Sequence, residues 1–386
     1  MAERDIAVIA GYFARCPLGG YAWQVLHYLL GFEELGFEVY FYEDTALYPD
    51  CFDPVTRTMP APCDAGVQTL SQFFAEHGLD QRWHFWEACS DRRFGLPWRD
   101  FSEAVACARL HITLAPVTRL PRLGRATRVF VDLDPGYTQI RCAAGDPDLR
   151  AFLEEHDCYF TIGEHIGSTR CPVPSGGFQW RPTRQPIVTR LWETAPPAPG
   201  APFTTIGRWH ESRRDIVFQG QRYGWSKRQE WQRFLDLPQR VAAGFVLAMD
   251  VEKESPDLTL LRSLGWEIVD PLQVSANPHA YRDFIAASAG EFTTAKDLNV
   301  RLRTGWFSDR SACYLAAGRP VITQATGFES ILPTGEGLFA VATVEEASAA
   351  IEKVLADSDR HRAAAKRIAS EWFAASTVLS ELLRGL

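Results

Sequence analysis

The sequence alternates short apolar segments with helical patterns in two runs, and a proline-rich stretch separates the two runs. The first run opens with Ile6–Ala10, which has the length and composition of a buried strand. Residues 171–202 then contain eight prolines, a density that excludes long helices and central strands. The alternation resumes at Phe203–Ile206. Strands separated by helices need crossover connections and form parallel sheets, so we expect an α/β protein with two domains.

The expected elements follow from the same patterns, and 386 residues suffice for two such domains. Further strands are expected at Phe37–Tyr42, His111–Ala115, Arg128–Leu133, Cys158–Ile162, Phe245–Ala248, Glu267–Val269, Gly290–Thr293 and Pro320–Thr323. Helices are expected at Lys227–Leu235, His279–Ala287, Ser311–Ala317, Val344–Leu355 and Arg360–Leu383.

The bulk composition excludes several classes of function. A formal net charge of −8 does not attract nucleic acid or anionic lipid. No apolar run approaches the roughly 18–20 residues that span a bilayer, and residues 1–10 lack the pattern of a secretion signal. Nine irregularly spaced cysteines without a Cys-x-x-Cys pair predict free thiols, and hence a cytoplasmic protein. Whether the chain forms a homodimer stays open.

The segment that opens at Lys296 contains the pattern with the most chemical content. Ser308 and Asp309 are good N-cap residues for the helix expected to begin there, and Arg310 and Ser311 follow them. The free backbone N–H groups and the positive dipole end of a helix N-terminus attract phosphate. We therefore expect a phosphate or a ribose to bind at this helix.

A glycine-containing loop lies between the first expected strand and the first helix. Gly19 and Gly20 allow a ligand to approach the backbone closely, although a tight turn is the alternative reading. The loop does not match G-x-G-x-x-G, so it does not indicate an NAD site.

Three carboxylates stand at the ends of expected strands. Asp44 ends the second strand, and Asp132 and Asp134 form an Asp-x-Asp pattern at the end of another. Because the carboxyl ends of parallel strands face the ligand in such sheets, Asp134 and Asp44 are candidate general bases. The Asp-x-Asp pattern could also hold a divalent metal against phosphates, or simply form a turn before Pro135.

The helix and strand that follow Arg310 carry a family resemblance. The order Ala316-Ala317-Gly318-Arg319-Pro320-Val321, followed by Gly327-Phe328-Glu329, resembles the nucleotide-sugar site of GT-B glycosyltransferases. The match is closest to the bacterial group-1-like and spore-coat-type enzymes. Gly305 and Cys313 stand where the common retaining enzymes of this class carry two glutamates, so the stereochemistry stays open.

The resemblance implies two Rossmann-like domains that face each other across a cleft. An acceptor-binding domain would cover residues 1–180 and a nucleotide-sugar-binding domain residues 203–360, and a C-terminal helix at 361–386 would pack back on the first domain. The reaction would transfer a hexose from a nucleoside-diphosphate sugar to a small-molecule or glycan acceptor, for example in natural product biosynthesis. Neither a metal nor a cofactor is expected.

The resemblance also assigns roles to individual residues. Arg208 and Lys227 resemble the basic pair that neutralises the leaving diphosphate in such enzymes. Asp134 or Asp44 would act as the base in an inverting reaction. The remaining donor-binding candidates are Gly19, Gly20, Lys296, Ser308, Asp309, Arg310 and Ser311. Two alternatives stay open: a sugar-nucleotide epimerase or phosphorylase on the same fold, and a non-catalytic two-lobed binding protein.

Overall fold

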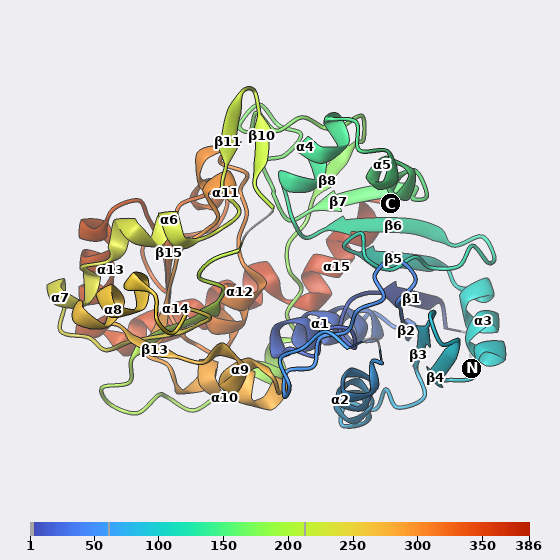
Figure 1. Ribbon diagram of the computed structural model, residues 1–386, viewed down its shortest axis with the longest axis horizontal. Coiled ribbons are helices and arrows are strands. Elements are labelled where there is room, and N and C mark those ends of the chain that lie inside the picture. Colours follow the sequence, from blue (N-terminus) through green and yellow to red (C-terminus); the bar gives the residue numbers. More distant parts are fainter. Residues whose placement is uncertain (1–3, 61, 212–213) are drawn as a thin grey trace.

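The computed structural model describes residues 4–60, 62–211 and 214–386. Two parallel sheets, each covered by helices, lie side by side, and helix α1 (Gly19–Glu34) lies between them (Figure 1). The prediction of an α/β protein with parallel sheets is confirmed.

The first sheet has eight strands in the order β4-β3-β2-β1-β5-β6-β7-β8, and only the β3–β4 pair is antiparallel. Its central strand β1 is apolar throughout, because helices cover both faces of a parallel sheet. The strands are β1 (Ile6–Ala10), β2 (Glu38–Asp44), β3 (Trp83–Glu87), β4 (Arg92–Gly95), β5 (Leu110–Leu114), β6 (Thr127–Asp132), β7 (Cys158–Thr161) and β8 (Trp180–Pro182). The other helices here are α2 (Asp64–Ala75), α3 (Trp98–Cys107), α4 (Tyr137–Ala143) and α5 (Pro147–Leu153).

The second sheet has six parallel strands in the order β13-β12-β9-β14-β15-β16. Both faces are again buried, and Trp231 packs edge to face on Trp266 and on Phe292 of β14 in its core. Its strands are β9 (Phe203–Gly207), β12 (Phe245–Met249), β13 (Glu267–Val269), β14 (Gly290–Thr293), β15 (Val321–Gln324) and β16 (Leu338–Val341). Its helices are α6 (Arg228–Trp231), α7 (Leu237–Arg240), α8 (Pro256–Ser263), α9 (Pro271–Ser275), α10 (Pro278–Ala287), α11 (Asp297–Arg301), α12 (Asp309–Ala316) and α13 (Val344–Ala356).

A hairpin of β10 (Ile216–Phe218) and β11 (Gln221–Tyr223) leaves the second sheet and contacts α4 of the first domain. Figure 1 shows this hairpin standing beside α4. Tyr223 is buried in one apolar cluster with Phe130 and Ile140 of the first domain. The hairpin therefore ties the two domains together above the cleft.

The chain crosses between the domains twice. The first crossing, after β8, contains the short turn η1 (Thr189–Trp192), and the second follows α14 (Ser358–Ile368). Ile187 of the first crossing pairs as an isolated parallel bridge with Ala374 of the second. Helix α15 (Ala375–Arg384) then packs on α1, where Gly31 leaves room for Leu379.

Several expected boundaries differ from the structure. The single helix expected at Arg360–Leu383 is interrupted by a π-helical turn (Ala369–Phe373) and by Ala374, whose ψ of 128° is extended. Strands β3, β4, β8 and β16 were not expected. Strand β8 lies inside the proline-rich stretch, where Pro182 is tolerated because β8 is an edge strand.

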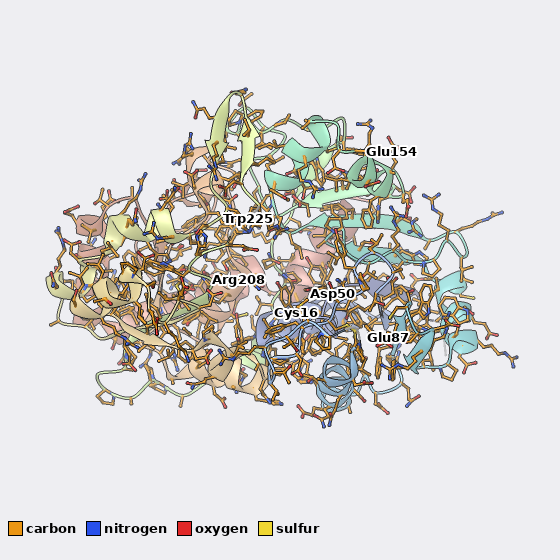
Figure 2. All side chains as sticks on the ribbon, viewed as in Figure 1. Cys16, Asp50, Glu87, Glu154, Arg208 and Trp225 are labelled. Atoms are coloured by element: carbon orange, nitrogen blue, oxygen red, sulfur yellow. A yellow bond between two sulfur atoms is a disulfide. The ribbon has the colours of Figure 1, made fainter. Side chains whose placement is uncertain are left out.

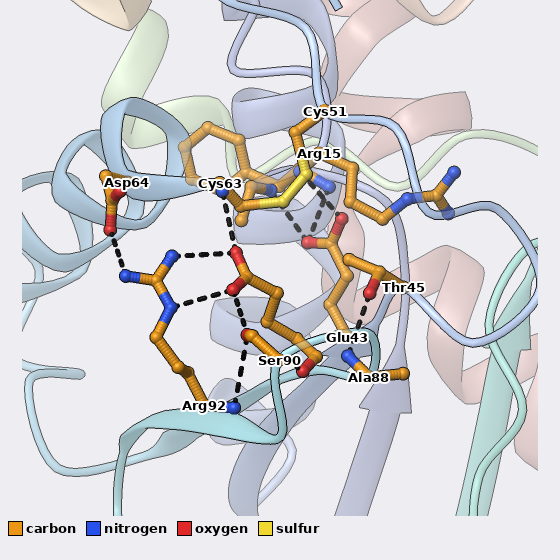
Figure 3. Close-up of a disulfide and its surroundings, with 12 residues drawn as sticks. Arg15, Glu43, Thr45, Cys51, Cys63, Asp64, Ala88, Ser90 and Arg92 are labelled. Atoms are coloured by element: carbon orange, nitrogen blue, oxygen red, sulfur yellow. Dashed lines mark hydrogen bonds and ion pairs between the residues drawn. A yellow bond between two sulfur atoms is a disulfide. The ribbon is translucent and has the colours of Figure 1, made fainter. Parts of the chain in front are cut away.

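The expectation that all cysteines are free thiols is wrong at two positions. Cys51 and Cys63 form a disulfide with a Cα–Cα distance of 5.4 Å (Figure 3). The bond closes the loop between these two cysteines. The spacing of the cysteines in the sequence does not reveal the pair. The other seven cysteines are free.

Candidate active site

An interdomain cavity of about 770 Å³ opens at the carboxyl ends of the second sheet. Strands β9, β12 and β13 end at its wall with Gly207, Met249 and Val269, and Tyr21 of α1 closes it from the first domain. Ligands in open α/β sheets bind at the carboxyl ends of the strands, so this cavity is the natural ligand site of the fold. Of the expected donor-binding residues it contains Gly20, Arg208, Asp309 and Arg310.

Helix α12 presents its N-terminus to this cavity. Ser308 occupies the N-cap position as expected, but its side chain caps no backbone N–H. Its hydroxyl instead donates to Asp309 Oδ1 at 3.4 Å. Asp309 also accepts from Gln24 of α1 at 3.4 Å, and burial raises the pKa of its carboxyl. Asp309 also accepts from the backbone N–H of Arg310, so only the first-turn N–H groups that Asp309 does not engage are left for a ligand.

Arg310 is held by the protein itself. Its Nε donates to Glu291 Oε1 at 2.5 Å, and its Nη2 donates to Thr293 Oγ1 at 3.0 Å. Its Nη1 donates to the carbonyl of Ile206 at 2.5 Å. Burial opposes the charge, but Glu291 holds the pKa of Arg310 above its ordinary value. All three nitrogens are engaged, so Arg310 supports the cavity wall.

Arg208 and Lys227 differ from Arg310 because neither forms an ion pair with a carboxylate in the described part of the chain. Arg208 is exposed in the cavity wall, in the middle of the molecule where the two halves meet (Figure 2). Burial lowers the pKa of Lys227 well below its usual value, and Arg310 lowers it further. The Lys227 ammonium lies 5.9 Å from the ring of Trp306. The guanidinium of Arg208 is a suitable counter-charge for a diphosphate, and a bound diphosphate would favour the charged form of Lys227 as well.

Lys296 and Asp134 are brought together across the domain boundary. The Lys296 ammonium lies 3.4 Å from Asp134 Oδ1 and 3.1 Å from the centroid of the Trp225 ring. Arg214 approaches Asp134 at 3.6 Å and also stacks over Trp225 at 4.3 Å. Burial lowers the pKa of Lys296, while Asp134 opposes that shift. Asp134 is thus the centre of a charged contact between the domains, and does not line the described cavity.

The two glycines of the β1–α1 loop serve different contacts. A Cβ at Gly19 would lie 2.3 Å from Cβ of Tyr281, so Gly19 lets α1 approach α10 of the other domain. Gly20 lines the cavity, and its nearest neighbour is the Tyr281 ring. Ser311 is buried in the first turn of α12, and its hydroxyl has no partner among the described atoms.

The carboxylates of Asp132 and Asp44, at strand ends of the first sheet, have different hydrogen-bond partners. Asp132 accepts hydrogen bonds from Thr138, Gln139 and Thr161, and burial raises its pKa to about 6. Asp132 therefore stabilises the turn after β6. Asp44 is buried at the end of β2, where it accepts from the N–H of Ala46 and burial raises its pKa. Asp44 is not part of the cavity wall.

Sequence reasoning missed three side chains in the cavity wall, Asp250, Asp270 and Arg57, and the buried Glu43 behind the β1–α1 loop. Asp250 and Asp270 stand directly after β12 and β13 in the cavity wall, positions that the strand-end argument could have found. Arg57, at the tip of the loop closed by the disulfide, pairs with Asp270 of the other domain. Glu43 holds the β1–α1 loop through three hydrogen bonds.

No protein-family model matches the sequence. No curated protein matches it either. Solved structures do match over the whole chain. Sucrose-phosphate synthase from Thermosynechococcus elongatus aligns with a TM-score of 0.54 at 13% identity, over 99% of both chains. HepE from Anabaena, solved with UDP and glucose, aligns with a TM-score of 0.55 at 11% identity, over 99% of this chain and all of HepE. An alpha-glucosyltransferase solved with UDP and a DNA 13-mer aligns with a TM-score of 0.56 at 10% identity, over 99% of both chains.

This chain has the GT-B fold. Its two sheets, its interdomain cavity and its returning C-terminal helix agree with that assignment. The expectation of two Rossmann-like domains facing across a cleft is confirmed. Among the described residues no three or more His, Cys, Asp or Glu side chains are grouped as metal ligands would be. No helix in the described segments is both long and apolar enough to cross a membrane.

Proposed function

We propose that the protein is a glycosyltransferase that moves a sugar from a nucleoside-diphosphate sugar to a small-molecule or glycan acceptor. The observation that carries this proposal is the placement of two basic residues that form no ion pair within the described residues. Arg208 lies in the cavity wall after β9, and Lys227, which precedes α6, lies near Arg310 and Asp309 at the N-terminus of α12. That combination is suited to a diphosphate, which needs two negative charges neutralised.

The proposed roles follow from this placement. The donor diphosphate would lie between the α12 N-terminus and the two cations, which stabilise the negative charge that develops as the sugar–phosphate bond breaks. With two cations and a helix dipole in place, the departing diphosphate needs no metal. The acceptor would approach from the first domain, at the side of the cavity formed by Tyr21 and Gly20.

The general base in an inverting reaction would be a carboxylate of the first domain. Asp134 is the first candidate, and it contacts Lys296 of the second domain directly. Asp44, with its raised pKa, is the second candidate. The structure of HepE with UDP and glucose, which has the same fold, supports the class of donor.

A thermal-shift screen with UDP, dTDP, GDP, ADP and NAD⁺, each with and without Mg²⁺, tests the proposal. A ligand at about 100 times its dissociation constant adds roughly 2.7 kcal/mol to the free energy of unfolding. We expect one nucleoside diphosphate to raise the midpoint without Mg²⁺, and Arg208→Ala to abolish this effect. Arg109→Ala, at an exposed ion pair with Asp5, is the matched control. Stabilisation by NAD⁺ alone would contradict the proposal.

Product analysis separates the remaining alternatives. Consumption of a nucleotide sugar without any acceptor would indicate an epimerase, and dependence on phosphate as co-substrate would indicate a phosphorylase. Binding without turnover across a broad acceptor panel would indicate a two-lobed binding protein.

A further inference from the structure

Arg15, in the loop after β1, is a buried arginine without a counter-charge. The residue is only 4% exposed, yet it forms no ion pair within 4.0 Å of a described carboxylate. Its Nη1 donates to the carbonyl of Val117 at 3.3 Å, while its Nε is buried without a partner. Buried charges in proteins are normally paired, because an uncompensated charge is costly to remove from water.

The unused side of the guanidinium is the one that recognises anions. The Nε and Nη2 atoms point the same way and bind a carboxylate or a phosphate through two parallel hydrogen bonds. Within the described residues neither atom donates a hydrogen bond. The hydrogen-bonding capacity of this bidentate edge is therefore unsatisfied, although the Nε atom itself is shielded from solvent.

The backbone of Arg15 is fixed on both sides. Its N–H donates to Glu43 Oε1 at 2.9 Å, and its carbonyl accepts from the N–H of Phe52 at 2.7 Å. Glu43 also accepts from the N–H groups of Phe13 and Ala14 at 2.9 and 2.7 Å. Figure 3 shows the Arg15 side chain running away from the Glu43 carboxylate that holds its backbone. The contacts orient the arginine without neutralising it.

Two tyrosine rings flank the guanidinium. Its central carbon lies 5.0 Å from the centroid of Tyr12 and 5.3 Å from that of Tyr48. Tyr48 is 51% exposed in the stretch after β2, and so covers the arginine from the solvent side. Tyr12 packs edge to face on Tyr21, which lines the interdomain cavity, at 5.0 Å between centroids. Arg15 is therefore separated from the cavity by two aromatic rings, Tyr12 and Tyr21, on the first-domain side.

We propose that Arg15, flanked by Tyr12 and Tyr48, binds an anionic group of the acceptor, either a carboxylate or a phosphate. The inference rests on the proposed transferase function and narrows its acceptor to an acidic molecule. Glu43 and Asp44 lie near Arg15, and burial raises the pKa of both carboxyls, that of Glu43 to about 7, which weakens their repulsion of an incoming anion. Displacement of the exposed Tyr48 ring gives the anion access.

Calorimetric titration of the full chain with glucose 6-phosphate, glucuronate and glucose tests the inference. The three probes share a ring and differ in charge, and the two anions separate a phosphate from a carboxylate. Saturating UDP is present in a parallel series, so that anions are kept out of the donor cavity. We expect at least one anion to bind about tenfold more tightly than glucose, with or without UDP.

Variants locate the anion. Arg15→Gln should abolish the preference for the anion, and Arg15→Lys should retain part of it for phosphate but less for carboxylate. Arg109→Gln is the control and should retain it fully. Circular dichroism checks that Arg15→Gln folds. If it does not fold, the test rests on Arg15→Lys, which should bind the phosphate probe more tightly than the carboxylate probe.

Three results would overturn the inference. One is equal affinity for glucose and for both anions, a second is a preference that survives in Arg15→Gln, and a third is a preference lost in Arg208→Ala but not in Arg15→Gln. The proposed function fails on a separate measurement, the absence of stabilisation of the wild type by any nucleoside diphosphate.

Discussion

The two sides of the interdomain cleft hold their arginines in different ways. In the second domain, Arg310 is neutralised by the buried carboxylate of Glu291, while Arg208 beside it has no described partner. In the first domain, Arg15 is oriented through its backbone and two aromatic rings, and none of the described carboxylates forms an ion pair with it. A cation whose charge the protein already neutralises supports the site. One that the protein orients but does not neutralise is available to a ligand.

The largest expected effect tests the supporting role of Arg310. Arg310→Ala would leave the fully buried Glu291 without its partner, and breaking a buried pair on one side costs about 3–5 kcal/mol. We expect chemical denaturation to show a loss of that size in the free energy of unfolding.

The double variant Arg310→Met with Glu291→Leu is the matched control, because it removes both charges together. It should recover most of the lost stability. If the denaturant midpoint of Arg310→Ala equals that of the wild type, Arg310 does not stabilise the fold. The proposed difference in role between Arg310 and Arg208 would then be wrong.

Arg208→Ala should have the opposite signature. The exposed, unpaired Arg208 can be removed with little change in stability, while a lost charge-assisted donor to the diphosphate lowers kcat/KM by about 100-fold or more. Steady-state kinetics with the nucleotide sugar identified by thermal shift measure the loss. A large fall in the melting midpoint without ligand would instead assign Arg208 to the fold.

The pH dependence of stability sharpens the view of Glu43 on the first-domain side. Burial raises its pKa from 4.5 to about 7, so the folded state binds a proton more tightly than the unfolded chain. Its contribution is fully present below pH 4.5 and is lost as the pH rises through about 7, a difference of roughly 3 kcal/mol at most.

Denaturation of the wild type and Glu43→Gln between pH 4.5 and 8 measures this contribution. The free energy of unfolding of the variant should depend less on pH over that range, because Gln does not titrate. Parallel curves for the two proteins would show that Glu43 stays charged and that its three N–H partners outweigh its burial.

The smallest effect is expected at the ion pair between Arg57 of the first domain and Asp270 of the second. Both residues line the cavity, and their side chains are 56% and 27% exposed. Surface pairs of this kind contribute about 0–1 kcal/mol and are screened by salt. Arg57→Ala should therefore change the affinity for the nucleoside diphosphate by less than about fivefold at low salt. A much larger effect that persists at high salt would make Arg57 a ligand contact.

The sequence predicted the architecture better than the details of the site. Apolar runs such as Ile6–Ala10 and the proline-rich stretch reveal two parallel α/β halves, because burial on both faces leaves a clear pattern. Short edge strands such as β8 were missed, since three residues that include a proline carry no periodic signal. The interruption at Ala374 was missed because the residues around it are good helix formers, and tertiary pairing with Ile187 decides their conformation.

At the site, the helix N-terminal pattern pointed to Asp309 and Arg310, the glycine loop to Gly20, and the family resemblance to Arg208. All four line the cavity, and their binding of the donor stays a prediction. Which cation is neutralised could not be predicted, because Glu291 and Arg310 meet only through the fold. Arg15 went unnoticed for the same reason. Its significance lies in the missing partner, which a sequence does not show.

The bridge between Ile187 and Ala374 restricts how this molecule can move. Both connections between the domains lie side by side at this point, so a rotation of one domain relative to the other would hinge there. Such a rotation would also have to separate the β10–β11 hairpin from α4. Because the second connection runs beside the first, proteolytic cleavage of either connection alone should leave the halves hinged together.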